Sequence, residues 1–336
     1  HKLIMAITWL IASLIFIAIF LLTLIITIFH FKTSTKNLPP GSFGWPIIGE
    51  TVAFHQAGLD GTPEAFVTER ASRHGCAQVF KTSVLCERVA VLCGPAGNRF
   101  LFGNENKLVQ VWWPSSARKL FGSCLLNAVG SEAKRVRKML LSFLGPDVLT
   151  RLYIDTMDVA TQQHIKAHWQ GKEEVKVYQT IKLYTFELAC RLFMSLEDPK
   201  HVSQLANQFY IFLKGAIQIP LNVPATRFYR ANKAAVAIRK QLGIIVKQRR
   251  VALEQKTASP SQDLLSHLLV SSDENGGFLS ETEIVDNILM LLFAGHDTSS
   301  VAITLLMKNL GQFPQVYEKV LRGNQHMHIY ALLCFI

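Results

Sequence analysis

The chain of 336 residues is long enough for one large folded domain or two smaller ones, and 49% hydrophobic with 18% charged residues is the composition of a folded protein. It is basic, with 35 Lys and Arg against 24 Asp and Glu, but it has no zinc-finger, RRM or helix-turn-helix pattern, so we predict no nucleic-acid partner. The six cysteines form neither a CxxC pair nor a metal-ligand spacing, which favours buried thiols in a reducing compartment.

Residues 3–29 are almost wholly apolar and long enough to cross a hydrocarbon core of roughly 30 Å. A cleaved signal peptide would have a shorter apolar core, about 7–15 residues, before a small-residue cleavage site, and this segment has neither. Lys2 precedes the segment, whereas Lys32 and Lys36 follow it, and this bias favours the cytosol for the rest of the chain. We therefore predict a single-pass transmembrane anchor in contact with membrane lipid.

Residues 30–49 form a connector rich in proline and glycine, which includes Leu38-Pro39-Pro40-Gly41. Prolines fix φ and remove backbone donors, and glycines permit turns, so the connector is predicted to be stiff and non-helical. It is either a generic linker or, as its aromatic and aliphatic residues favour, a segment that docks onto the domain behind it.

Beyond the connector, runs with β-branched residues at 79–85 and 88–93 predict a short β-hairpin, ended by Gly94-Pro95. Between the later helices, the 217–225 loop carries aliphatic residues, as either a plug in the core or a second membrane-touching patch beside a substrate entrance. The predicted fold class is mainly α with a minor β-sheet. Helical periodicity covers 131–144, 150–169, 177–194, 201–216, 231–256 and 262–269.

The stretch from 280 to 310 is a long apolar run that begins like a helix. Ser280 is a suitable N-cap, and Glu283 three residues later completes a capping box. The apolar residues that follow cover every face, which predicts a core helix buried all round.

The centre of this helix, residues 294–298, contains residue types that are unfavourable there. Gly295 costs about 1 kcal/mol relative to alanine in a helix interior, and a buried carboxylate such as Asp297 needs a partner. Gly295 would leave room for a planar ligand, and Asp297 would be a buried acid in a proton path. Alternatively, Thr298 donates a hydrogen bond to the Ala294 carbonyl and the segment is only a polar bend.

No Walker loop, GxGxxG, HExxH or GxSxG motif occurs, so a nucleotide-phosphate site, a zinc peptidase and a serine hydrolase have no motif support. The anchor, the Leu38–Gly41 motif, the 294–299 segment and the later Pro314-Tyr317-Glu318 positions together resemble a microsomal cytochrome P-450, a haem-thiolate monooxygenase. The order and spacing match to about Arg322. Residues 50–322 are therefore expected to form a partial domain, the N-terminal two-thirds of the cytochrome P-450 fold, behind a single transmembrane helix.

Three further segments are similar to the plant branch of that family that oxidises triterpenoids such as β-amyrin, to which taxane hydroxylases are related. They are Phe100–Leu108, Trp112-Trp113-Pro114 and Pro224–Phe228. The two tryptophans and the 220–228 loop fall where the family builds its substrate pocket and entrance, although core packing is the other interpretation of the tryptophans.

The resemblance also implies roles for single residues. Ala294 and Gly295 would lie against haem, the implied cofactor, and Asp297 and Thr298 would relay protons to iron-bound dioxygen. Arg137 matches the arginine that pairs with a haem propionate. The family often has a tryptophan four residues before that arginine, where this chain has Ala133, so an ordinary surface charge is the other interpretation of Arg137.

The family's iron site lies in segments beyond the central helix: an ExxR pair, a Pro-Glu-Arg-Phe-like segment and a glycine-flanked cysteine loop whose thiolate ligates iron. Glu132 and Arg135 spell ExxR far upstream, which we take for a chance match, and Cys334 has no glycine frame. The axial cysteine is therefore expected to be absent from this chain. Residues 323–336 carry no Asp, Glu, Lys or Arg and are expected to be a non-family tail from an unspliced intron or a frameshift after Arg322.

Two hypotheses follow from the resemblance. The first is a monooxygenase of the endoplasmic-reticulum membrane, with its body in the cytosol, that inserts one oxygen atom of O2 into a C–H bond of a large apolar terpenoid or triterpenoid. An NADPH-cytochrome reductase would supply electrons, and the scattered basic groups suit docking of an acidic partner. The second is a truncated, membrane-anchored product that lacks the iron ligand and does not catalyse.

Overall fold

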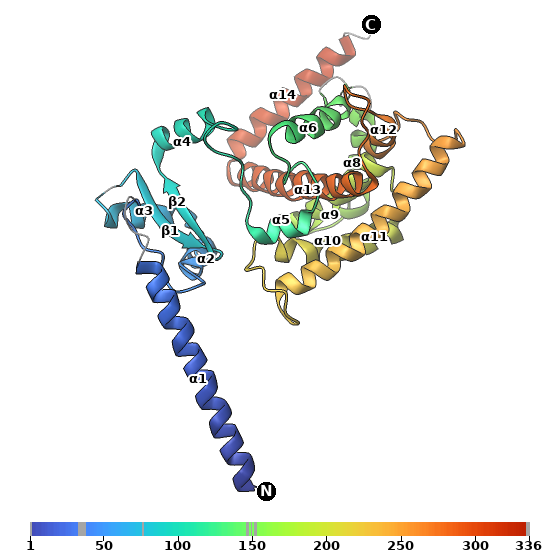
Figure 1. Ribbon diagram of the computed structural model, residues 1–336. Helices are drawn as coiled ribbons and strands as arrows, with labels where there is room; N and C mark the ends of the chain where they lie inside the picture. Colours follow the sequence, from blue (N-terminus) through green and yellow to red (C-terminus); the bar gives the residue numbers. More distant parts are fainter. Residues whose placement is uncertain are drawn as a thin grey trace. The chain divides into compact units, whose positions relative to one another are not determined.

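Figure 1 shows the computed structural model, which describes residues 2–32, 38–75, 77–145, 148, 150 and 153–333. The chain divides into two compact units, residues 1–114 and 115–336, and each is described by itself. Helices dominate both, and the first also contains a two-stranded antiparallel sheet. The predicted class, mainly α with a minor β-sheet, is confirmed.

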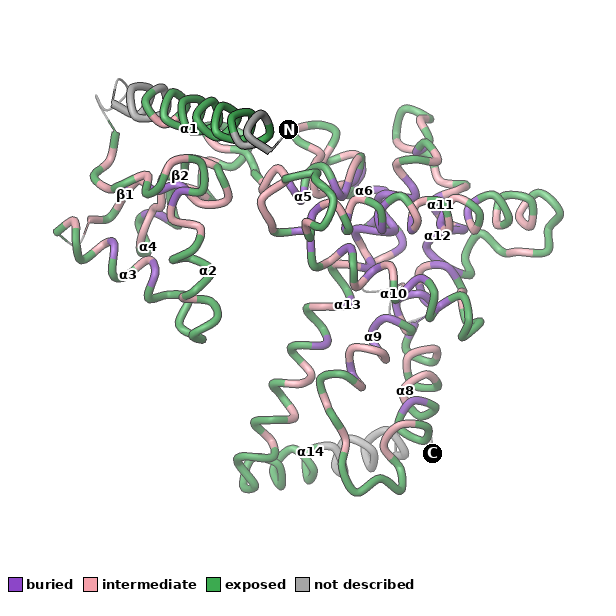
Figure 2. The backbone as a smooth tube through the Cα atoms, turned by 90° about the horizontal axis from the view of Figure 1, so that it is seen from below, coloured by how far each residue is buried: buried purple, intermediate pink, exposed green. Residues whose placement is uncertain are grey.

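The first unit begins with α1 (Lys2–Lys32), whose residues of described burial are almost all exposed (Figure 2). Two helices in the described part of the chain are long and apolar enough to cross a membrane, namely α1 over Ile7–Ile25 and α13 (Glu281–Gln312). None of the α1 window is buried, whereas a third of the α13 window is. We interpret α13 as a core helix because its first half is buried against neighbouring helices, and α1 as the membrane-span candidate.

The hairpin is made by β1 (Val79–Val84) and β2 (Glu87–Leu92), which pair in antiparallel register. Its two loop residues, Leu85 and Cys86, both have positive φ, as a tight two-residue turn between twisted strands requires. The hairpin prediction is confirmed.

The connector docks onto β1 instead of hanging free. The Lys81 amide donates to the Pro40 carbonyl at 2.8 Å, and the Glu50 amide donates to the Ser83 carbonyl at 2.7 Å. Gly41 has a φ of 132°, and a Cβ there would collide with the Lys81 carbonyl, so close backbone approach requires the glycine. The docking interpretation is confirmed for this part of the connector.

One ion pair holds the rest of the first unit together. Arg70 of α3 (Pro63–Arg73) donates to Glu50 at 2.9 Å, and Thr82 of β1 donates to the same carboxylate at 2.6 Å. Desolvation raises the pKa of Glu50, but the hydrogen bonds from Arg70 and Thr82 outweigh it and leave this pKa below its usual value. Three short helices of this unit, α2 (Thr51–Leu59), α3 and α4 (Gly94–Gly103), were not predicted, because two or three turns give too little periodicity.

The second unit is a helical body in which all six predicted helices recur within about four residues of their predicted ends, while α5 and α14 were not predicted. Its helices are α5 (Ser115–Phe121), α6 (Gly130–Leu144), α8 (Ile154–His168), α9 (Val177–Met194), α10 (Pro199–Ala216), α11 (Arg227–Glu254), α12 (Leu264–Val270), α13 and α14 (Pro314–Leu333).

The core of this unit lies between α9, α10, α11 and the first half of α13. Its largest buried side chains include Phe121, Phe186 and Phe209. Gly215 of α10 lets α11 approach closely, because a Cβ there would collide with that of Ala231. The 217–225 loop leaves this core: Ile217, Leu221 and Val223 are each about half exposed, so the core-plug interpretation is wrong.

Helix α13 begins as predicted, with the capping box present. The Glu283 amide donates to Ser280 Oγ at 3.2 Å, and the Ser280 amide donates to Glu283 Oε2 at 2.8 Å. Its first half is largely buried as far as Leu292. In the second half, Leu305 is half exposed and Leu306 is more than half exposed. The prediction of burial on all sides is therefore wrong for the second half, where residues 301–312 are exposed or only partly buried in the described chain.

Replacing Ser280 with alanine is expected to lower the free energy of unfolding by about 0.5–2 kcal/mol, because α13 would lose its side-chain cap. Urea unfolding of the chain in detergent micelles measures the change. Ser299→Ala on the exposed face of the same helix is the matched control, expected to change stability by less than about 0.5 kcal/mol. Equal losses in the two variants would contradict the capping role.

Candidate active site

The 294–298 segment lies within the continuous helix α13 and divides its residues between two faces. At about 100° per residue, Ala294, Gly295 and Thr298 share one side of the helix, and all three are exposed. His296 points to the opposite side and is fully buried. The helix therefore presents a strip of small residues on its open face.

The open face has free space beside Gly295, and at Thr298 it carries a hydroxyl that already donates a hydrogen bond. A Cβ built at Gly295 would meet only the Phe193 ring, at 3.8 Å, apart from the helix's own backbone. Thr298 Oγ1 donates to the Ala294 carbonyl at 2.6 Å, the bond expected from their spacing. The hydroxyl thus remains at the open face, with lone pairs that accept further hydrogen bonds.

Asp297 is the charged residue of the strip. Its side chain is 41% exposed, and Lys182 of α9 places Nζ 3.2 Å from Asp297 Oδ1, an ion pair without the alignment of a hydrogen bond. Lys182 Nζ also lies 5.4 Å from the Tyr178 ring and 5.3 Å from the Tyr210 ring. The carboxylate is therefore neutralised on one side and open to solvent on the other, so the expectation that Asp297 is a buried acid is wrong. Its partner Lys182 was not found from the sequence.

His296 fastens this part of α13 to the core. Thr185 of α9 bonds His296 Nδ1 at 2.9 Å, and the rings of Phe186, Phe209 and Tyr210 surround the imidazole at 5.4–5.8 Å between centroids. Burial, with a smaller effect of nearby Lys182, lowers the pKa of His296 to about 4, against the opposing effect of Asp297. The imidazole is thus neutral at physiological pH.

Acidification should destabilise the chain through His296. The unfolded imidazole binds a proton near pH 6.5 and the folded one only near pH 4, so stability is complete above pH 6.5 and falls as the pH drops to 4, by up to roughly 3 kcal/mol. We expect His296→Gln to reduce the slope of unfolding free energy against pH by about 1.4 kcal/mol per pH unit in that window. Between pH 7 and 8 the curves of unfolding free energy against pH should be parallel for the two proteins. An unchanged slope below pH 6 in the variant would contradict the assignment of this pH dependence to His296.

Arg137 lies on α6, where its side chain is exposed and makes no ion pair with any described residue. The structure joins Ala294, Gly295, Asp297 and Thr298 on one helix, but it shows no contact between them and Arg137. Instead, α6 contacts the start of α13 through Arg135, two residues before Arg137.

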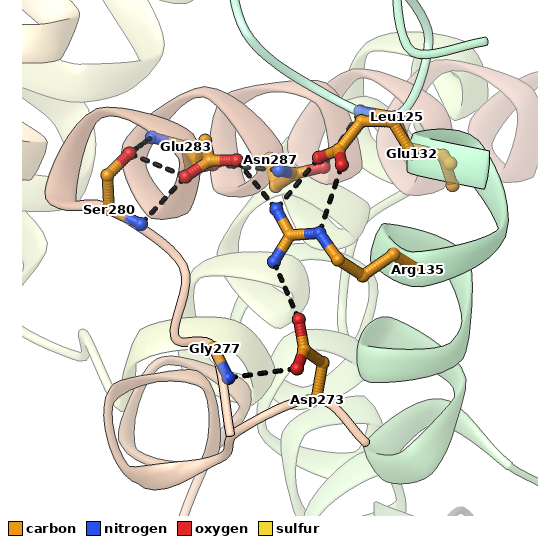
Figure 3. Close-up of polar contacts among 8 residues, drawn as sticks. All are labelled: Leu125, Glu132, Arg135, Asp273, Gly277, Ser280, Glu283 and Asn287. Atoms are coloured by element: carbon orange, nitrogen blue, oxygen red, sulfur yellow. Dashed lines mark hydrogen bonds and ion pairs between the residues drawn. The ribbon is translucent and has the colours of Figure 1, made fainter. Parts of the chain in front are cut away.

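That residue, Arg135, sits among three carboxylates (Figure 3). It donates to Glu132 at 2.8 Å, to Glu283 of α13 at 3.0 Å and to Asp273 at 3.4 Å. Backbone amides of Gly277 and Asn275, and then Arg135, lower the pKa of Asp273. The Glu132–Arg135 spacing is thus a helical ion pair, as i,i+3 spacing permits, while its partners on other elements were not foreseen.

A cleft of about 750 Å³ opens beside this cluster, between α6 and residues 271–275. Its lining mixes both charge signs, with Lys134, Lys138 and Glu274, and includes none of residues 294–298. We therefore assign the candidate site to the open face of α13 and not to this cleft.

Trp112 is exposed and Trp113 partly buried, so core packing does not account for Trp112.

Comparison with known proteins gives a consistent result. Residues 39–326 match the family described as Cytochrome P450. The chain is 48% identical to a β-amyrin 28-monooxygenase of Medicago truncatula, covering 87% of this chain and 61% of the relative, and 49% identical to one of Vitis vinifera, covering 84% and 59%. It thus spans about 60% of the length of the curated relatives it matches, and the resemblance to the plant triterpenoid branch is confirmed.

Solved structures agree on the fold. The retinoic-acid-bound cyanobacterial CYP120A1 matches with a TM-score of 0.74 at 32% identity, covering 84% of this chain and 62% of that one. A heme-domain structure titled cytochrome P450DA matches with a TM-score of 0.64 at 15% identity. The fold expected from the sequence is confirmed.

Proposed function

This chain belongs to the cytochrome P450 family, and from that premise we propose that the protein containing it is a haem-dependent monooxygenase that oxidises a C–H bond of a triterpenoid. The observation that carries the proposal is the open strip of Ala294, Gly295 and Thr298 on α13, with Asp297 beside it. Relatives named β-amyrin 28-monooxygenase support the substrate class.

The residues present fit one side of a haem. Ala294 and Gly295 add almost no bulk to the open face, so a flat ring has room there. Arg137 offers an exposed guanidinium without a described ion-pair partner, which suits a propionate carboxylate. Haem, when bound, would supply the activation of dioxygen and the oxygen transfer.

The polypeptide would bind and orient the substrate and move protons. We assign the proton path to Asp297 and Thr298, because the carboxylate faces solvent on one side and the hydroxyl lies on the open face. Lys182 would hold the carboxylate near the strip, and Thr298 Oγ1, whose own proton goes to the Ala294 carbonyl, would accept a hydrogen bond at the end of the path. His296 is excluded from this role by its complete burial.

We further propose that α1 anchors the protein in the endoplasmic-reticulum membrane with the body in the cytosol, because lysines are more numerous after the span than before it. The partner would be an NADPH-cytochrome reductase, and the net charge of +11 on this chain favours a partner whose docking surface is acidic. The exposed aliphatic residues of the 217–225 loop support a second contact with lipid.

The activity is tested in yeast that produces β-amyrin and a plant NADPH-cytochrome reductase. Expression of the whole protein that contains residues 1–336 should give a β-amyrin product that has gained oxygen, detected by mass spectrometry. A Thr298→Ala variant is the control for catalysis by this site. No oxidised triterpenoid, despite a normal haem spectrum, would reject the proposed substrate class.

The non-catalytic hypothesis makes a different prediction, because the sequence leads us to expect no axial cysteine within residues 1–336. In the described chain Cys124 and Cys190 are buried, and desolvation raises the pKa of both thiols, which disfavours a thiolate at either. A carbon-monoxide difference spectrum of the expressed 336-residue chain separates the hypotheses. A thiolate-type Soret band would refute the non-catalytic one, and its absence would support it.

A further inference from the structure

The turn between α5 and α6, residues 122–125, has two backbone amides that donate to side chains of α13 instead of to neighbouring backbone. The Ser123 amide donates to Asp286 Oδ2 at 2.7 Å, and the Leu125 amide donates to Asn287 Oδ1 at 3.0 Å. Asp286 is 1% exposed and Asn287 is fully buried. Because buried polar side chains need hydrogen-bond partners, these two bonds fix the position of the turn against α13.

A third element completes the cluster. Arg239 of α11 donates to Asp286 Oδ1 at 2.6 Å and to the Leu120 carbonyl, at the end of α5, at 2.7 Å. Gly122 fits against both charged groups with a φ of 66°, and a Cβ there would collide with Asp286 and lie 2.9 Å from Arg239 Nη2. The turn, α11 and α13 therefore meet at one buried carboxylate with little space left.

Helix α13 also bonds α6 itself, at Glu283, one helical turn before Asp286 and Asn287. Glu283 accepts from Arg135 of α6 at 3.0 Å (Figure 3), and the side-chain Nδ2 of Asn287 donates to the Glu283 backbone carbonyl at 2.8 Å. Along α13, Asp286 precedes Asp297 by eleven residues, about 16 Å. One rigid helix thus bears both the supports of α6 and the open strip.

We propose that Asp286 and Asn287, together with Arg239, are positioning residues that hold the 122–125 turn, and with it the start of α6 that leads to Arg137, against the helix that carries residues 294–298. The catalytic importance of this arrangement rests on the proposed function. The positioning itself is a property of the polypeptide and is measurable without turnover.

The rival explanation is a buried ion pair that contributes only to overall stability. The chain contains two cysteines that distinguish the explanations. Cys124 lies inside the turn and is 3% exposed, whereas Cys190 lies in α9 and is fully buried. Opening of the turn alone exposes Cys124, and global unfolding exposes both.

The test is mass-spectrometric thiol labelling of the 336-residue chain in detergent micelles. In Asp286→Ala, labelling of Cys124 should accelerate roughly tenfold or more while Cys190 keeps its protection. Asp286→Asn retains an acceptor for the Ser123 amide and should give an intermediate rate. Glu197→Gln is the matched control, because it removes the charge of an exposed carboxylate paired with Arg191 and should leave Cys124 protected.

Asn287→Ala is the second variant if Asp286→Ala does not fold, since it removes the Leu125 acceptor without leaving a charge unpaired. It should also accelerate hydrogen exchange in peptides that cover the first turn of α6, and not in peptides of α9 or α10. Unchanged Cys124 labelling in both variants, or equal acceleration of Cys124 and Cys190, would overturn the proposal. Because no substrate or haem is used, this failure is distinguishable from failure of the proposed monooxygenase activity.

Discussion

Asp297→Asn is expected to slow the proposed substrate oxidation by the whole protein about 10²–10⁴-fold, the usual contribution of a positioned acid or base, with little change in substrate affinity. The amide has nearly the same shape but does not carry a proton. Within 294–298 no other group substitutes for it: His296 is fully buried against Thr185, and Thr298 is an alcohol. Product formation under saturating substrate and substrate-binding spectra measure the two effects separately.

The Asp297–Lys182 ion pair provides the control for this prediction. If the carboxylate serves only as the partner of Lys182, then Lys182→Met should slow oxidation as much as Asp297→Asn does. If the carboxylate carries protons, Lys182→Met should cost much less, because the acid itself is still present. Equal losses in both variants would therefore remove Asp297 from the proton path.

Asp263→Ala should be among the most destabilising changes in the chain, with a loss of about 3–5 kcal/mol of unfolding free energy. Asp263 is fully buried and pairs with Arg249 of α11. It also caps α12 by accepting from the Ser266 amide at 2.7 Å, and it accepts from Ser195 at 2.6 Å. Its loss leaves the largely buried Arg249 guanidinium without its charge partner at the junction of α9, α11 and α12.

Two comparisons isolate the buried charge in urea unfolding experiments. Asp198→Ala removes an N-cap aspartate from α10 that is half exposed, so it should cost only about 0.5–2 kcal/mol. Asp263→Ser combined with Arg249→Met keeps a cap and removes both charges, so it should recover most of the loss. A cost for Asp263→Ala no larger than that for Asp198→Ala would contradict the mechanism.

Local patterns predicted those parts of the fold that local chemistry controls. The α9 helix was predicted with its observed ends, and Ser280 and Glu283 revealed the start of α13 because a capping box needs only residues three apart. The short helices α2, α3, α4 and α5 escaped prediction, since two or three turns leave few apolar repeats and their packing partners lie elsewhere in the chain. Burial of the second half of α13 was predicted wrongly, because apolar composition does not indicate which neighbours cover a helix.

The strip at 294–298 shows the same division. The sequence by itself determined that a glycine, an acid and an alcohol lie together on one long helix, because helical spacing requires it. Only the tertiary structure decided that Lys182 neutralises Asp297, that His296 faces the core, and that Asp286 and Arg239 hold the turn before α6. Such partners lie tens to more than a hundred residues away, so their pairing depends on how the helices pack and leaves no periodic signal in the chain.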